Sequence, residues 1–141
     1  MAEREIAEGL IPHRGPARLV QAILEDPRPD VCVCGGRIPA ESAFVAGGRA
    51  PAVVLLELAA QAAAVQQALA APAGSVPARP GYLVAIRAAS FHADDVAAGV
   101  PLIATVRRTG QAGPLATYDV TVNGPDGQTI VSASLSTHAG G

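Results

Sequence analysis

The distribution of apolar and polar positions separates a helical middle from two β-rich flanks. Residues 51–71 are strong helix formers for about 20 positions, and Pro72 and Gly74 end the run. Apolar residues surround this segment on almost every side, which predicts a helix that is buried over most of its surface. Pro51 suits the first helical turn, where a missing N–H costs nothing.

The flank before the helix predicts two strands. Residues 17–25 form an apolar segment that runs from a short turn into a first strand, and residues 31–38 alternate as a second strand does. Gly35 and Gly36 lie within the second strand, where they mark a bulge or the close approach of another backbone.

The flank after the helix predicts four strands that are separated by glycine-containing turns. Residues 123–127 read Asn-Gly-Pro-Asp-Gly, which is typical of a hairpin turn. The short connections imply that consecutive strands are antiparallel neighbours. The four strands are expected at residues 81–91, 101–108, 116–123 and 129–138.

The order of two strands, one buried helix and four strands predicts an α+β fold in which a curved antiparallel sheet wraps the helix. Such a sheet leaves an edge strand exposed. Pairing of two copies edge to edge would cover that strand, so we expect a dimer.

Composition fits one soluble domain that spans residues 1–141. Half of the residues are apolar and 16% are charged, and the net charge of −2 with a pI near 5.8 argues against nucleic acid as a partner. Polar residues interrupt the apolar run 51–71, which argues against a membrane span. The segment 1–9 is acidic and lacks the apolar stretch of a signal peptide, so we expect a cytoplasmic protein.

The two cysteines, Cys32 and Cys34, stand two positions apart in the second predicted strand and should project from the same face. No nearby cysteine or histidine completes a zinc set, so no metal is expected. Two roles remain for the pair: small buried hydrophobic side chains, which base rates favour, or a redox function.

Three segments together resemble the hotdog-fold 3-hydroxyacyl-[acyl-carrier-protein] dehydratases. Residues 10–14 (LIPHR) are similar to the opening Pro-His-Arg segment of that family, residues 51–63 to its helix with Glu and Gln four positions apart, and residues 81–84 to the strand that follows. The resemblance spans nearly the whole chain. It implies a hotdog fold and a hydro-lyase of fatty acid or polyene biosynthesis that acts on acyl thioesters.

The loop before the helix departs from the housekeeping dehydratases, which carry Gly-His-Phe-Pro there with a catalytic His. Alignment without a gap places Ala43 at that His, beside Phe44. Alanine cannot take a proton. The loop looks more like the subgroup found with aryl-polyene biosynthesis (ApeP-like), which lacks the His motif and keeps Pro-His and Glu-x-x-x-Gln.

Dehydration requires a base for the α-proton, an acid for the hydroxyl that leaves, and donors for the enolate-like oxygen. Glu57 is the main candidate for proton transfer, because burial of a lone carboxylate in an apolar helix favours the protonated form that a donor needs. The alternative is a Glu on an exposed strip or in the first helical turns. Gln61 shares its helix face at i+4, and either orients the carboxylate, binds substrate or ties the helix to the sheet.

Other site candidates come from the loops. The backbone N–H near Ala52 is expected to act as an oxyanion donor, and Gly47 and Gly48 either let a thioester approach the main chain or form an ordinary turn. The resemblance places His13 in the site as a second catalytic residue, with a structural role as the alternative. Three arginines are candidates for contacting phosphopantetheine or an acidic carrier protein, or are surface charges: Arg49, Arg79 and Arg87.

Three functions remain open from the sequence. The first is a dehydratase that uses Glu57 and needs no cofactor beyond the phosphopantetheine of an acyl carrier protein or CoA that carries its substrate. The second is an acyl thioesterase on the same fold. The third is a non-catalytic acyl-carrier-binding subunit, either in a homodimer or as the inactive half of a heterodimer, which Ala43 makes reasonable.

Overall fold

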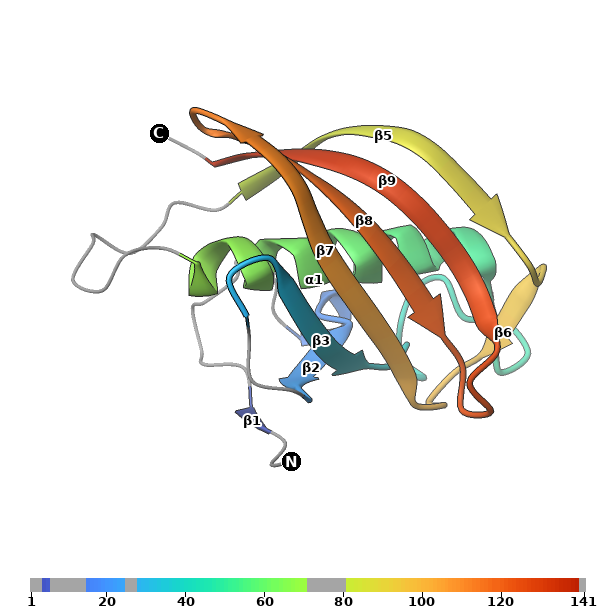
Figure 1. The fold of residues 1–141 in the computed structure, drawn as a ribbon. Helices are drawn as coiled ribbons and strands as arrows, with labels where there is room; N and C mark the ends of the chain where they lie inside the picture. The colour runs from blue at the N-terminus through green and yellow to red at the C-terminus, as the bar shows by residue number, and fades with distance from the viewer. Residues whose placement is uncertain (1–3, 6–14, 25–27, 71–80, 140–141) are drawn as a thin grey trace.

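A computed structural model describes residues 4–5, 15–24, 28–70 and 81–139. One α-helix, α1 (Leu55–Leu69), lies across the concave side of a curved antiparallel sheet (Figure 1). A single 3-10 turn, η2 (Ala52–Val54), leads directly into α1. The predicted helix is therefore confirmed: the 3-10 turn begins one residue after Pro51 and α1 begins at Leu55, while the predicted end at residue 71 lies outside the described residues.

The sheet has seven strands in the order β1-β2-β3-β7-β8-β9-β5. Alternation of buried and exposed positions is clearest in β8, whose inward side chains pack on α1. The strands before the helix are β1 (Arg4–Glu5), β2 (Val20–Ile23) and β3 (Val31–Gly36); those after it are β5 (Gly81–Phe91), β7 (Leu102–Ala112), β8 (Leu115–Asn123) and β9 (Thr129–Ala139).

The prediction that consecutive strands are always neighbours is wrong at one point. β5 pairs with β9, and β7 pairs with β3 and β8, so β5 stands at the edge of the sheet. The connection from β5 to β7 contains a short strand, β6 (Asp95–Ala97), which pairs with β4 (Arg49–Pro51) in a separate two-stranded sheet. Neither short strand has a hydrophobic period long enough to be predicted from sequence. The β8–β9 hairpin turn is confirmed.

The core between helix and sheet is built from small side chains. Ala59, Ala62 and Ala63 of α1 are fully buried, which allows the sheet to approach closely. A Cβ added at Gly36 would lie 2.7 Å from the Leu19 carbonyl oxygen and 2.8 Å from Leu58 Cδ1, so the predicted close approach at this glycine is confirmed. The segment Ala52–Leu69 is long and apolar enough to cross a membrane, but 56% of it is buried within the molecule as a core helix.

Cys32 and Cys34 project from the same face of β3, as predicted, and both are buried. Their sulfur atoms lie 3.6 Å apart and are not joined by a disulfide. The contact with Cys32 and burial raise the pKa of Cys34 far above the usual range, so this thiol stays protonated. The pair therefore serves as core packing.

Candidate functional site

A cleft of about 550 Å³ lies beside the first turns of α1, and its wall is mostly apolar. The start of the helix, the residues before β2, the loop between β3 and β4, and the middle of β5 each supply part of the lining. Glu57 and Ser42 are the two polar side chains among the described lining residues; the apolar ones are Ala17, Leu19, Phe44, Pro51, Val53, Val54, Leu56 and Ile86.

Glu57 lies in the first turn of α1 and faces this cleft. The expectation that its side chain is buried is wrong for the single chain, where Glu57 is exposed. The reason is that the sheet covers the opposite side of the helix, leaving the strip of Val53 and Glu57 uncovered. A carboxylate in a first helical turn is also favoured by the helix dipole. The position beside an apolar cleft keeps Glu57 as the candidate for proton transfer.

Gln61 is fully buried and its amide makes four hydrogen bonds. Its Oε1 accepts the backbone N–H groups of Leu19 and Val20 at 2.7 and 3.1 Å. Its Nε2 donates to the Ala17 carbonyl at 2.7 Å and to Glu57 Oε1 at 3.2 Å. Both amide hydrogens are used, so Gln61 positions the carboxylate and ties the helix to the segment before β2. This arrangement leaves it no donor for substrate.

The Ala52 amide is not the oxyanion donor that was expected, because its N–H donates to the Asp94 carbonyl at 2.9 Å. This bond extends the β4–β6 pairing by one residue. The N–H groups that follow Ala52 in the first helical turn are the remaining backbone candidates.

Gly47 and Gly48 have φ values of 60° and 75° and occupy the two central positions of a tight turn closed by Ala46 and Arg49. They are not among the residues that line the cleft. The turn accounts for both glycines, and their contact with substrate stays a prediction.

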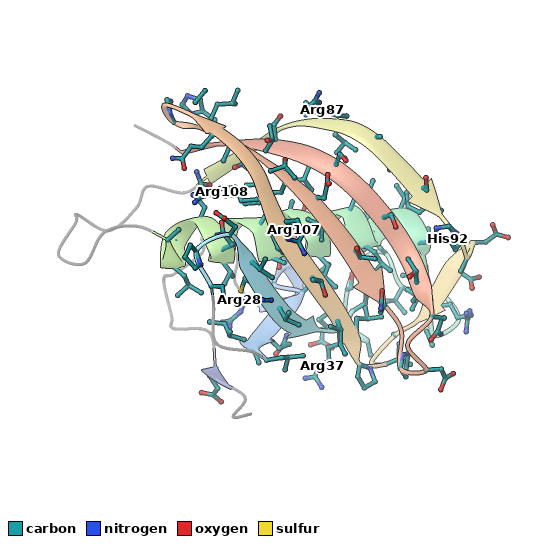
Figure 2. All side chains as sticks on the ribbon, viewed as in Figure 1. Arg28, Arg37, Arg87, His92, Arg107 and Arg108 are labelled. Carbon is teal, nitrogen blue, oxygen red and sulfur yellow. The ribbon has the colours of Figure 1, made fainter. Side chains whose placement is uncertain are left out.

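His13 and Arg79 lie outside the described residues. Arg49 pairs with Asp95 at 2.7 Å, both side chains being about half exposed. Arg87 points outward from β5, away from α1 (Figure 2). No group of His, Cys, Asp and Glu suited to a metal ion occurs in the part of the chain that the structure describes.

Several buried polar groups have no counterpart in the sequence analysis. Gln66 of α1 is only 2% exposed and donates to the Pro29 carbonyl at 2.9 Å. The Tyr118 hydroxyl is buried without a hydrogen bond of normal geometry among the described residues. Burial raises the pKa of Tyr118, and Arg108 and the nearby Thr137 hydroxyl offset this in part. Ser42, the second polar residue of the cleft, has no neighbouring motif that would have identified it.

Exposed hydrophobic side chains concentrate around the cleft. Phe44 is 64% exposed, Val53 57% and Ile86 40%, and all three line it. The adjoining strand β5 is a sheet edge, and each of residues 85–91 is exposed. A soluble protein seldom leaves such an apolar edge uncovered.

Comparisons with solved structures agree with this architecture. A chain of the dehydratase heterocomplex ApeI:P from Xenorhabdus doucetiae superposes with a TM-score of 0.83 at 18% identity, covering 94% of this chain and 89% of that one. The E. coli PaaI protein from the phenylacetic acid degradation operon gives a TM-score of 0.62 at 18% identity, covering 84% and 78%. A hypothetical thioesterase with coenzyme A from Streptococcus pneumoniae TIGR4 gives 0.61 at 15% identity, covering 84% of each chain. These similarities show the hotdog fold.

No curated protein matches the chain. The family model described as ApeP-like, ApeP dehydratase, matches residues 5–140. This match covers the helix, the cleft and every strand of the sheet from β2 to β9. The chain therefore belongs to the ApeP-like dehydratase family.

Proposed function

We propose that the protein dehydrates 3-hydroxyacyl thioesters, carried on an acyl carrier protein or on CoA, and that Glu57 transfers the proton. The observation that carries this proposal is the Glu57 carboxylate, held by Gln61, at the side of a mostly apolar cleft. The cleft volume of about 550 Å³ is within the range of small-molecule sites.

The reaction removes a proton from C2 and a hydroxyl from C3 of the acyl group. The Glu57 carboxylate takes the C2 proton, giving an enolate-like thioester, and the resulting carboxylic acid gives this proton to the departing 3-hydroxyl. Water and a 2-enoyl thioester are the products, and the carboxylate is regenerated. Backbone N–H groups after Ala52 are suited to stabilise the thioester oxygen.

Gln61 supports this chemistry by fixing the orientation of Glu57. The backbone N–H groups of Leu19 and Val20 hold its Oε1, so its Nε2 must face the carboxylate. Glu57 Oε1 thereby accepts a hydrogen bond from a side chain whose own position is fixed. Such an arrangement reduces the reorganisation needed during proton transfer.

A second hotdog subunit is the partner that the exposed surface fits. It would pair with the β5 edge, cover Phe44, Val53 and Ile86, and close the open side of the cleft. Closure would exclude water from Glu57 and from the acyl chain.

Ala43 supports a second candidate function, in which this chain is the non-catalytic subunit of a heterodimer. Ala43 stands where the housekeeping dehydratases have their catalytic His, so the loop of this chain contributes no imidazole. In that case turnover belongs to a site in the partner subunit and does not depend on Glu57.

The test is an assay of the purified protein with 3-hydroxyacyl and with unsubstituted acyl thioesters, following enoyl product and free thiol. We expect enoyl product, with a loss of at least about 100-fold in Glu57→Gln, a magnitude typical of general acid–base groups. Glu5→Gln, on the opposite edge of the sheet, is the matched control and should retain activity. Release of thiol would indicate a thioesterase. Absence of both products, or unchanged turnover in Glu57→Gln, would contradict the proposed role of Glu57.

A further inference from the structure

Ser42 is a polar residue of the cleft wall that does not belong to the helix. It lies in the loop between β3 and β4, directly before Ala43, and is only 8% exposed. Apart from Glu57, no other polar side chain belongs to the lining formed by the described residues. A ligand in the cleft therefore meets one carboxylate from α1 and one hydroxyl from this loop.

The loop holds the Ser42 side chain in a fixed position. Its backbone N–H donates to the Pro39 carbonyl at 3.0 Å, and its carbonyl accepts the Val45 N–H at 3.1 Å. The Ser42 Oγ accepts the Phe44 N–H at 3.3 Å. Within the described ranges no acceptor takes the hydroxyl hydrogen of Ser42. A buried hydroxyl with an unused donor at the wall of an apolar cleft is suited to bind an oxygen atom of a ligand.

The two polar groups of the cleft are complementary to a substrate hydroxyl. An alcohol has one hydrogen to donate and an oxygen that accepts. An ionised Glu57 only accepts, so before it has taken the C2 proton it has nothing to donate to the 3-hydroxyl oxygen. Among the described lining residues, Ser42 is the side chain that has a hydrogen to donate. The thioester carbonyl oxygen also accepts hydrogen bonds. The backbone N–H groups at the start of the helix are suited to bind that oxygen, which leaves Ser42 for the 3-hydroxyl.

We propose that Ser42 donates its hydroxyl hydrogen to the 3-hydroxyl oxygen of the acyl group and makes the cleft selective for 3-hydroxyacyl over unsubstituted acyl thioesters. This proposal rests on the proposed function and adds a specificity-determining residue to it. A donor on this oxygen also stabilises the negative charge that develops as the C3–O bond breaks.

The experiment measures binding of a 3-hydroxyacyl pantetheine thioester and of the acyl pantetheine of equal length without the hydroxyl. The full chain, in the assembly in which it purifies, is compared with Ser42→Ala, Ser42→Thr and Ser132→Ala by calorimetry. Ser132 lies on β9 between the inward residues Val131 and Ala133, so its hydroxyl faces the outer side of the sheet and serves as the control. Circular dichroism melting confirms that each variant is folded.

We expect Ser42→Ala to weaken binding of the 3-hydroxyacyl ligand by about five- to tenfold, the effect of one hydrogen bond, and to leave the unsubstituted ligand within about twofold. Ser42→Thr should keep the preference for the hydroxylated ligand, and Ser132→Ala should match the wild type. Equal weakening of both ligands, or no weakening of either, would overturn the role of Ser42.

The two proposals fail in different ways. If the wild type forms enoyl product through Glu57 but Ser42→Ala keeps the full preference for the 3-hydroxyacyl ligand, only the Ser42 proposal is wrong. A wild-type protein that binds neither thioester would overturn both.

Discussion

Gln61 makes four side-chain hydrogen bonds at the site: three connect the helix to residues 17–20 and one holds Glu57 on the same helix. Two backbone N–H groups and one carbonyl of residues 17–20 depend on its amide, and so does the orientation of Glu57. The glutamine and its partners Leu19 and Val20 are buried, so water cannot replace the two bonds between them. A substitution here therefore affects both stability and the carboxylate.

We predict that Gln61→Leu lowers the free energy of unfolding by about 3 kcal/mol or more, because it leaves two buried backbone N–H groups, those of Leu19 and Val20, without partners. Gln67→Leu removes one hydrogen bond, from Thr137 at 3.2 Å on a partly buried side chain, and should cost about 1 kcal/mol or less. Urea denaturation measures both values. Similar losses in the two variants would show that residues 17–20 find other partners when the Gln61 amide is absent.

The contact between Glu57 and Gln61 could be predicted from the sequence, but the hydrogen bonds of Gln61 to residues 17–20 could not. Two residues four apart on a helix share a face, so their contact is local. The partners of Gln61 in residues 17–20 lie more than 40 positions away along the chain. Ser42 was missed for a similar reason, because one serine in a loop has no period or motif that relates it to a helix.

At the scale of elements, the contact between β3 and α1 depends on one glycine. Gly36 has an ordinary φ, so its role is steric: the Leu19 carbonyl and the Leu58 side chain occupy the space that a Cβ would need. Leu19 is also a partner of Gln61. This contact therefore places the residues before β2 against the helix at the site.

We predict that Gly36→Ala destabilises the protein by about 1–3 kcal/mol, because a backbone carbonyl 2.7 Å away cannot move as a side chain can. Gly35→Ala is the matched control. Its nearest contact is the end of the Leu24 side chain at 3.2 Å, and the change should stay within about 1 kcal/mol. Thermal unfolding of both variants tests the difference, and equal midpoints would mean that β2 shifts to accommodate the methyl group.

The sequence predicted the helix and the main strands better than it predicted which strands pair with each other. Apolar residues on all sides of residues 51–71 predicted a buried helix, and glycine-rich turns delimited the later strands. The neighbour of β5 was predicted wrongly, because strand order in a sheet depends on contacts across the whole chain and short connections are only one guide to it.

At the scale of the molecule, exposed hydrophobic residues divide between the outer face of the sheet and the side that carries the cleft. Ile103 and Leu115 lie on β7 and β8, whereas four others surround the helix start and the β5 edge: Phe44, Val53, Ile86 and Phe91. β5 is an edge strand of the described sheet (Figure 1), and its residue Ile86 also lines the cleft. A partner bound there would satisfy the backbone of β5 and bury the apolar side chains together.

We predict that Phe91→Asp dissociates the assembly to a single chain of 14.1 kDa, measured by sedimentation, because it places a charge at the β5 edge without altering a cleft residue. Ile103→Asp is the control, since Ile103 is 40% exposed and Phe91 43%, but Ile103 lies on an inner strand of the sheet. That variant should keep the mass of the wild type.

Dissociation by Ile103→Asp alone would place the interface on the outer face and leave the cleft open. Dissociation by Phe91→Asp together with lost turnover would show that the subunit at the β5 edge completes the site around Glu57.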